Sequence, residues 1–252
     1  MNNVKGVALV TGASSGLGAA YCRQLANQCK TIIAVGRRAD RLEALRLELE
    51  GGTCVYPVVA DLTTVEGVTR SVEALRQQGP VSILVNNAGF STLGDFADSA
   101  LDVELQMVRL HIDAPLELVR AALPFMREQG AGSIINVSSV GAYLDMQKTA
   151  VYGGCKAFLL TFSKALQAEE AGHGIRVQCI CPGLTRTEIH DNPHFAGFDK
   201  SRFPAGMWME ADEVVTESLS ALRGTEVAVI PGRINRDLVR KSLQQQLSLL
   251  EE

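Results

Sequence analysis

The sequence lacks the features that mark several classes of protein. No apolar run approaches the ~18 residues that a membrane-spanning helix needs. The apolar stretch at 7–10 is also too short for the core of a signal peptide, which needs about 7–15 residues. Neither sign of charge dominates, because 24 basic and 28 acidic residues give a net charge of -4. We therefore expect a cytoplasmic protein that binds neither nucleic acid nor a membrane.

The six cysteines also lack the C-x-x-C spacing of zinc sites and redox motifs. They are scattered along the chain as Cys22, Cys29, Cys54, Cys155, Cys179 and Cys181. In a reducing compartment such cysteines are usually buried small hydrophobic residues, so we expect no disulfide and no metal. The composition, with 46% hydrophobic and 21% charged residues, excludes a disordered chain.

What the sequence does contain is a regular alternation of strands and helices. Short β-branched runs are expected to be strands at 6–11, 31–36, 53–59, 82–86, 133–138, 175–181 and 225–230. Most are continuously apolar, which is typical of strands buried on both faces of a parallel sheet. Helices are expected between them, for example at 40–50, at 64–78 and at 101–129, where Pro115 and Pro124 predict a bend or break.

Seven strands alternating with helices predict an α/β protein of Rossmann type, with a doubly wound, seven-stranded parallel sheet. No linker, internal repeat or low-complexity segment interrupts the pattern, so we expect one domain over 1–252. The segment 188–212 has no clear period and is expected to be a small substrate lid.

A glycine-rich turn follows the first strand and opens a helix. In this turn Gly12 permits a tight bend, Gly16 lets backbone N–H groups approach a pyrophosphate, and Gly18 lets the helix pack on the strand. Ser14 and Ser15 can donate hydroxyl groups to phosphate oxygens. A purely structural glycine turn is the alternative.

The segment T-G-A-S-S-G-L-G at 11–18 resembles the cofactor motif of the short-chain dehydrogenase/reductase family. Later motifs occur in the family's order: Asp61-Leu62, Asn86-Asn87-Ala88-Gly89, Ser139, Tyr152 with Lys156, and Pro182-Gly183. The resemblance spans nearly the whole chain and implies a nicotinamide cofactor. It implies cofactor contacts at Leu17, Asp61, Leu62, Asn87, Ala88, Gly89, Tyr152, Lys156, Pro182, Gly183, Thr185 and Thr187. The Asn-Ala-Gly turn can also brace the sheet, and Pro-Gly is also an ordinary turn.

The end of the second strand bears on which nicotinamide cofactor is used. An NAD site has an acidic residue there, whereas this chain has Gly36 followed by Arg37 and Arg38. A guanidinium can bind the 2′-phosphate of NADP, so we favour NADP(H), with Arg37 as the first candidate and Arg38 as the second. Two solvated surface arginines are the alternative.

Tyr152 and Lys156 are spaced i, i+4 and should share one helix face. A neighbouring ammonium lowers the pKa of a tyrosine, which would let Tyr152 exchange a proton with a carbonyl oxygen during hydride transfer. Ser139 would hold that oxygen, and Ser138 is a weaker candidate. Taken alone, a Tyr–Lys pair at this spacing is also common on helix surfaces.

Many members of this family carry a fourth catalytic residue, an asparagine that holds a water of a proton relay; the matching position here is His111. His111 either replaces that asparagine and titrates near pH ~6.5, or is a buried structural histidine, or the relay runs differently. His190 and His194 share i, i+4 spacing, but nothing completes a zinc site around them.

The substrate pocket is expected from 90–94, 143–147 and the aromatic-rich 188–212 segment, which favours a fairly apolar carbonyl or alcohol. The C-terminal region 234–252 departs from the family and predicts a helix at 236–250 with one apolar face. That helix either covers the body or contacts another subunit. We expect a homo-oligomer, either a dimer or a tetramer, and a monomer stays open as an alternative.

The expected function is NADP(H)-dependent carbonyl reduction or its reverse. Two alternatives remain open at this point. One is an NADP-binding sensor or scaffold without turnover, and the other is an epimerase or dehydratase on the same fold.

Overall fold

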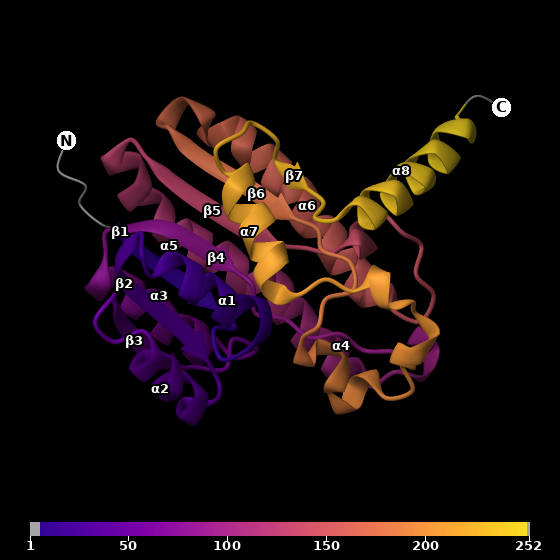
Figure 1. Cartoon of the computed structure of the whole chain (residues 1–252), viewed down its shortest axis with the longest axis horizontal. Helices are drawn as coiled ribbons and strands as arrows, with labels where there is room; N and C mark the ends of the chain where they lie inside the picture. The colour runs from indigo at the N-terminus through magenta and orange to yellow at the C-terminus, as the bar shows by residue number, and fades with distance from the viewer. Residues whose placement is uncertain (1–5, 251–252) are drawn as a thin grey trace.

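The computed structural model describes residues 6–250, which form one seven-stranded parallel sheet with helices on both faces (Figure 1). The strands are β1 (Gly6–Thr11), β2 (Cys29–Gly36), β3 (Cys54–Val59), β4 (Val81–Asn86), β5 (Gly132–Val137), β6 (Ile175–Ile180) and β7 (Ala228–Val229). Their order across the sheet is β3-β2-β1-β4-β5-β6-β7, and all pairs are parallel. The predicted doubly wound Rossmann-type sheet is confirmed. Its strand order reverses between β1 and β4, where ligands bind in such folds.

Strand burial explains why the central strands have continuous apolar sequences. Alternate residues of β1 and β2 point to opposite faces, so Leu9 and Ile33 join one core while Val10 and Ile32 join the other. The edge strand β3 differs, because Tyr56 and Val59 are exposed there. The predicted burial of all six cysteines is therefore wrong at one residue, since Cys54 is exposed on this edge.

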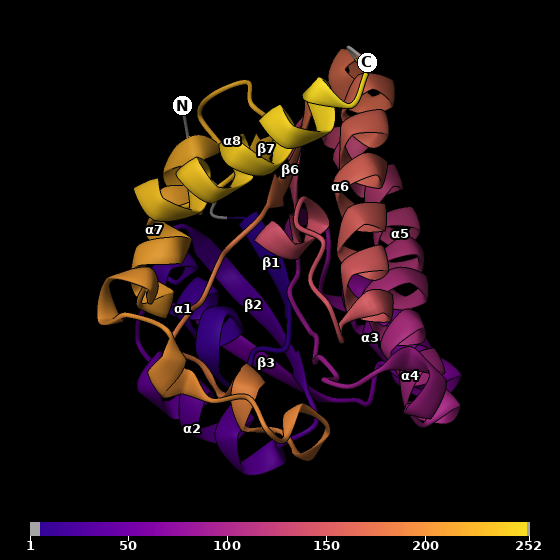
Figure 2. The same cartoon turned by 90° about the vertical axis from the view of Figure 1, so that its right-hand side faces the viewer.

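Two helical layers cover the sheet, as Figure 2 shows. One layer contains α1 (Gly16–Leu25), α2 (Ala39–Glu48) and α7 (Ala211–Ala221), and the other contains α3 (Val65–Gln78), α5 (Ala114–Gln129) and α6 (Ala150–Glu170). The Thr64 side chain caps α3 by accepting a hydrogen bond from the Gly67 N–H at 3.1 Å. In the part of the chain that the structure describes, no helix is long and apolar enough to span a bilayer.

The long helix expected at 101–129 is interrupted, as its prolines predict, but at one place only. It divides into α4 (Leu101–Val108), a π-helical turn over Arg109–Asp113, and α5. Pro115 lies in the first turn of α5, where its missing N–H costs little, and Pro124 lies inside α5 without ending it. The π-helical turn carries His111 toward the carboxyl end of the sheet.

The 188–212 segment leaves the body after β6 and returns to it. It contains four short 3₁₀ turns, and its far end pairs with the chain just before the segment, because Met209 N–H donates to Leu184 O at 3.0 Å. Two hydrogen bonds tie it to the loop at 90–94: Leu93 N–H donates to His194 O at 2.9 Å, and the Asn192 amide donates to Ser91 O at 3.3 Å.

The C-terminal helix α8 (Arg233–Ser248) starts three residues earlier than predicted. Its residues up to Ser242 contact the body through buried Asn235 and Val239 and through the Ser242 hydroxyl, which donates to Tyr143 O at 2.6 Å. The remaining part of the helix projects from the body (Figure 1) and exposes Leu243 and Leu247. The predicted apolar face is thus only partly covered within one chain.

Candidate active site

A cavity of about 890 Å³ lies at the carboxyl ends of the strands, in the crevice where the strand order reverses. It brings together most of the residues singled out from the sequence. Its lining includes Gly12, Ser14, Ser15, Gly16, Leu17, Arg37, Arg38, Asp61, Leu62, Asn87, Ala88, Gly89, Ser139, Tyr152, Lys156, Pro182, Gly183, Thr185 and Thr187. Gly18 and His111 are not among the lining residues.

The glycine turn has the geometry that its sequence predicts. Gly12 has a φ of 67°, and a Cβ there would come within 2.9 Å of the Ala88 Cα. A Cβ on Gly18 would come within 2.2 Å of the Gly12 carbonyl oxygen, so this position holds α1 against the turn. At the N-terminus of α1, Ser15 makes no side-chain capping hydrogen bond. The first N–H groups of α1 are therefore not capped by that side chain, as an anion site at a helix N-terminus requires.

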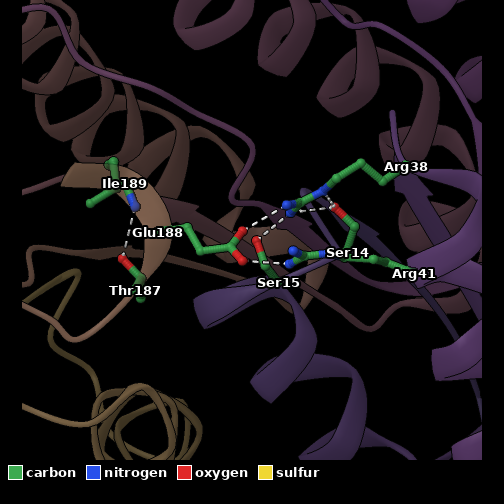
Figure 3. Close-up of polar contacts among 7 residues, drawn as sticks. All are labelled: Ser14, Ser15, Arg38, Arg41, Thr187, Glu188 and Ile189. Atoms are coloured by element: carbon green, nitrogen blue, oxygen red, sulfur yellow. Dashed lines mark hydrogen bonds and ion pairs between the residues drawn. The ribbon is translucent and has the colours of Figure 1, made fainter. Parts of the chain in front are cut away.

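A basic corner lies beside this turn (Figure 3). We use this name for Arg38 and Arg41 together with Ser14 and Ser15. Arg38 donates to the Ser14 hydroxyl at 3.0 and 3.2 Å and to the Ser15 hydroxyl at 2.6 Å. Both arginines also donate to one carboxylate, that of Glu188. Arg38 is thus fixed at the end of the cavity beside the glycine turn.

The two consecutive arginines differ in their surroundings. Arg37 lines the cavity but is exposed, and among residues 6–250 it makes no hydrogen bond or ion pair, whereas Arg38 is held by both serines. Sequence reasoning missed Arg41 and the position of Glu188. Arg41 follows Arg38 by three residues on α2, so helical spacing could have revealed it.

The turn after β4 supports the sheet and borders the cavity at once. The Asn87 amide donates to Thr11 O at 2.8 Å, and the Asn87 N–H donates to the Thr11 hydroxyl at 2.9 Å. Asp61, after β3, accepts hydrogen bonds from the N–H and hydroxyl of Thr63 at 3.0 and 2.8 Å. Asn87 can therefore brace the sheet and border the cavity at the same time.

Ser139, Tyr152 and Lys156 meet at the other end of the cavity. Lys156 is buried on α6, and its ammonium lies 5.3 Å from the centre of the Tyr152 ring and donates to Val137 O at 2.8 Å. No carboxylate among the described residues forms an ion pair with it. The Ser138 hydroxyl donates to Lys156 O at 2.7 Å, so it is committed to the helix and Ser139 is the better-placed serine.

Burial changes the acid–base properties of this trio. It raises the pKa of Tyr152 to about 12, and the Ser139 hydroxyl offsets part of that rise. It also lowers the pKa of Lys156 to about 8. The sequence predicted that Lys156 would lower the pKa of Tyr152; in the structure loss of solvent is the largest influence on that pKa, and the neutral phenol is favoured.

His111 packs behind the turn after β4 and beside the tyrosine. Its ring stands edge-on to the Tyr152 ring with 5.8 Å between centres, and its Nε2 lies 2.9 Å from Phe90 O. Its Nδ1 is buried without a partner in the described part of the chain. Burial, and then the charge of Lys156, lower the pKa of His111 well below 6.5. Burial therefore favours the neutral imidazole over the titration near pH 6.5 that the sequence suggested.

The remaining wall of the cavity comes from the segment after β6 and from the predicted substrate loops. Gly183 lies close against α8, since a Cβ there would be 2.1 Å from the Asn235 amide oxygen. Thr187 crosses the glycine turn, with its methyl group 3.0 Å from where a Cβ of Gly16 would be. The apolar part is lined by Phe90, Leu93, Leu144, Met146, Phe195, Phe198, Phe203, Met207 and Leu238. Leu238 belongs to α8 and was not anticipated.

His190 and His194 do not form a metal site. His190 stacks on Phe198 with 4.8 Å between ring centres, and His194 lies against Phe90 at 6.3 Å. Within residues 6–250 no group of three or more His, Cys, Asp or Glu residues could hold a metal ion. Both histidines are thus packed among aromatic rings of the 188–212 segment and the loop at 90–94.

The sheet and this cavity define a Rossmann-type oxidoreductase, and comparison with known proteins identifies its family. The short chain dehydrogenase profile matches residues 6–194, so the chain belongs to the short-chain dehydrogenase family. A serine 3-dehydrogenase of Agrobacterium fabrum is 37% identical over 188 residues, which cover 74% of each chain.

Solved structures agree over nearly the full length. A short-chain dehydrogenase from Sphingobium yanoikuyae in complex with NADPH has a TM-score of 0.84 and 33% identity, covering 96% of this chain and 95% of that one. A short chain dehydrogenase from Burkholderia cenocepacia in complex with NADP has a TM-score of 0.80 and 26% identity, covering 99% and 97%. The chain is thus an oxidoreductase of this family.

Proposed function

We propose that the protein is an NADP(H)-dependent oxidoreductase that reduces a carbonyl group to an alcohol or catalyses the reverse reaction. One observation carries this proposal: a single cavity joins the basic corner at Arg38 to the trio of Ser139, Tyr152 and Lys156. Relatives that contain NADPH and NADP support the choice of cofactor.

The residues of the cavity fit such a cofactor along its length. The glycine turn and the α1 N-terminus would hold the pyrophosphate, and Arg38 would bind the 2′-phosphate through charge-assisted hydrogen bonds. Lys156 is a buried cation with donors to spare, so it would hold the hydroxyl groups of the nicotinamide ribose. When bound, the nicotinamide supplies or accepts the hydride.

The proton is handled by the tyrosine. Tyr152 would donate its phenolic proton to the carbonyl oxygen as the carbon accepts hydride, and Ser139 would hold that oxygen where negative charge develops. The high pKa keeps the phenol protonated, which suits reduction. In the reverse reaction Tyr152 must first lose its proton, so alcohol oxidation should become faster as pH rises.

The lining of the cavity favours an apolar substrate. Phenylalanine, leucine and methionine side chains surround the space next to Tyr152, and α8 contributes Leu238. In our proposal the 188–212 segment is the lid over this space. A ketone with at least one bulky apolar group fits such a wall better than a substrate with a free carboxylate or phosphate.

Cofactor oxidation over a panel of carbonyl compounds tests the function directly. We expect loss of NADPH absorbance with apolar ketones or aldehydes, and a much slower reaction with NADH. Binding of NADPH without turnover on any compound would favour a sensor instead. Conversion of a substrate with no net change in NADPH would favour an epimerase or dehydratase.

His111 is proposed to hold a water molecule of the proton path that leads to Lys156. Its buried Nδ1 has no partner in the described residues, and an acceptor so placed is usually satisfied by water. We expect His111→Asn to keep kcat within about tenfold, since an amide can bind water in the same way. His111→Leu, which cannot, should lower kcat by about a further tenfold.

The pH dependence separates this role from direct acid–base catalysis by His111. Because the low pKa keeps the imidazole neutral, the pH profiles of kcat for the wild type and His111→Asn should superimpose between pH 5 and 7. An acidic limb in the wild type that disappears in His111→Asn would mean that His111 itself titrates during turnover.

A further inference from the structure

Glu188 is the first residue of the 188–212 segment, and its side chain turns back into the basic corner (Figure 3). Its Oε2 accepts a hydrogen bond from Arg38 Nη1 at 2.7 Å, and its Oε1 accepts one from Arg41 Nη1. These contacts join positions 150 and 147 residues apart. A carboxylate of the proposed lid is thus paired with the cations nearest the glycine turn.

The donors of Arg38 are almost fully used in this arrangement. Nε donates to Ser14, Nη2 donates to Ser14 and Ser15, and Nη1 donates to Glu188. A guanidinium has five N–H groups, so one remains without a partner in the described residues. Arginine binds phosphate most tightly through two parallel hydrogen bonds. Such a bidentate contact with Arg38 therefore requires at least one present partner to leave.

We propose that Glu188 is a specificity-determining residue that competes with a ribose 2′-phosphate for Arg38 and Arg41. A cofactor with a 2′-phosphate would displace the carboxylate and free the start of the lid, whereas one without it would leave Glu188 in place. This inference rests on the proposed use of NADP(H) and adds a residue that opposes it.

Of the groups around Arg38, Glu188 is the one that a phosphate would displace. Both anions carry negative charge and need the same guanidinium groups, so they repel each other, while the serine hydroxyls can bind phosphate as well as arginine. The arginines hold the pKa of Glu188 at about 2, with the hydrogen bond from Arg38 as the largest cause. The carboxylate is therefore charged at every pH at which the protein would work.

The ion pair between Arg38 and Glu188 is weak enough for a phosphate to displace Glu188. The side chains of Arg38 and Glu188 are 39% and 44% exposed, and ion pairs so exposed contribute little to stability. A phosphate, with up to two charges and three oxygens, is the stronger ligand for the two arginines. Glu188 thus weakens phosphate binding without preventing it.

A second cavity gives the displaced carboxylate a place to go. This cavity, of about 630 Å³, shares Thr187 and Glu188 with the first cavity and is also lined by Arg186, Lys200 and Trp208 among others. Arg186 and Lys200 already pair with Glu210 and Asp191, but their positive charges would also attract the displaced Glu188 carboxylate. Trp208, the only tryptophan of the chain, lies 5.7 Å from the Arg186 guanidinium, so its fluorescence should report the move.

Comparing adenosine 2′-monophosphate with adenosine 5′-monophosphate tests the 2′-phosphate alone, because the two ligands differ only in the position of the phosphate. We expect Glu188→Gln to bind the 2′-monophosphate about three- to tenfold more tightly than the wild type, because loss of two exposed ion pairs has an effect of this size. Its affinity for the 5′-monophosphate should change less than twofold. Calorimetric titration of the full-length chain measures both.

Glu48→Gln is the matched control. Glu48 pairs with Arg23 by two hydrogen bonds, at 2.6 and 3.0 Å, and is 45% exposed, but it does not line the cavity. The substitution removes the same charge from the chain. It should leave both affinities unchanged, and a gain equal to that of Glu188→Gln would mean that net charge alone is responsible.

Fluorescence excited at 295 nm, where adenine does not absorb, gives the second measurement. In the wild type, Trp208 emission should change on binding the 2′-monophosphate and not on binding the 5′-monophosphate. In Glu188→Gln that difference should shrink. Equal or weaker binding of the 2′-monophosphate by Glu188→Gln overturns the inference, whereas a wild type that binds neither NADP⁺ nor the 2′-monophosphate overturns the proposed function itself.

Discussion

Replacing Tyr152 with phenylalanine should lower kcat for carbonyl reduction by about 10³-fold or more, because a positioned general acid contributes 10²–10⁴-fold. The ring stays, so its edge contact with His111 and its position below the Lys156 ammonium stay as well. What disappears is the proton that the carbonyl oxygen needs when hydride arrives. The affinity for NADPH should therefore change by no more than about threefold, and turnover with the best panel substrate together with NADPH binding measures the contrast.

Tyr143→Phe is the matched control for that substitution. Tyr143 lies in a neighbouring loop, is half-buried and also has a raised pKa from burial, but it is not among the residues that line the cavity. It should keep nearly all activity. A Tyr152→Phe protein that retains more than a tenth of the wild-type kcat would place the proton donor elsewhere, with Ser139 as the first residue to examine.

Most of the fold could be predicted from the sequence because the local patterns of the chain predict the same strands and helices that the sheet requires. The apolar strands and the threonine cap of α3 each depend on residues close together in the chain. The errors arise where the neighbours are distant. Cys54 looks like a core residue in its own strand, but β3 is at the edge of the sheet, and only the strand order reveals that.

The site shows the same division. The spacing of Tyr152 and Lys156 is local and predicted their shared face, but the raised pKa of Tyr152 comes from burial by the whole fold. The choice between Ser138 and Ser139 needed the hydrogen bond to Lys156 O. Glu188 could not be linked to Arg38 from sequence, because a contact over 150 residues leaves no local signal in a single chain.

The second large effect is expected at Arg38. Arg38→Ala should lower kcat/KM for NADPH by about 10- to 100-fold, since hydrogen bonds to charged groups contribute about 1.5–3 kcal/mol and 1.4 kcal/mol corresponds to tenfold. The value for NADH should hardly change. Arg37→Ala, at the exposed neighbour, should alter kcat/KM for NADPH by less than about threefold, because Arg37 is not held by Ser14 and Ser15.

Those two substitutions test which arginine binds the 2′-phosphate: Arg37, which the sequence favours, or Arg38, which we propose. A larger loss in Arg37→Ala than in Arg38→Ala would return the 2′-phosphate to Arg37. Combining Arg38→Ala with Glu188→Gln adds a test of how the two residues are coupled. If phosphate and carboxylate need the same guanidinium, the gain in NADPH affinity from Glu188→Gln should shrink once Arg38 is absent, and the remaining gain measures the share of Arg41.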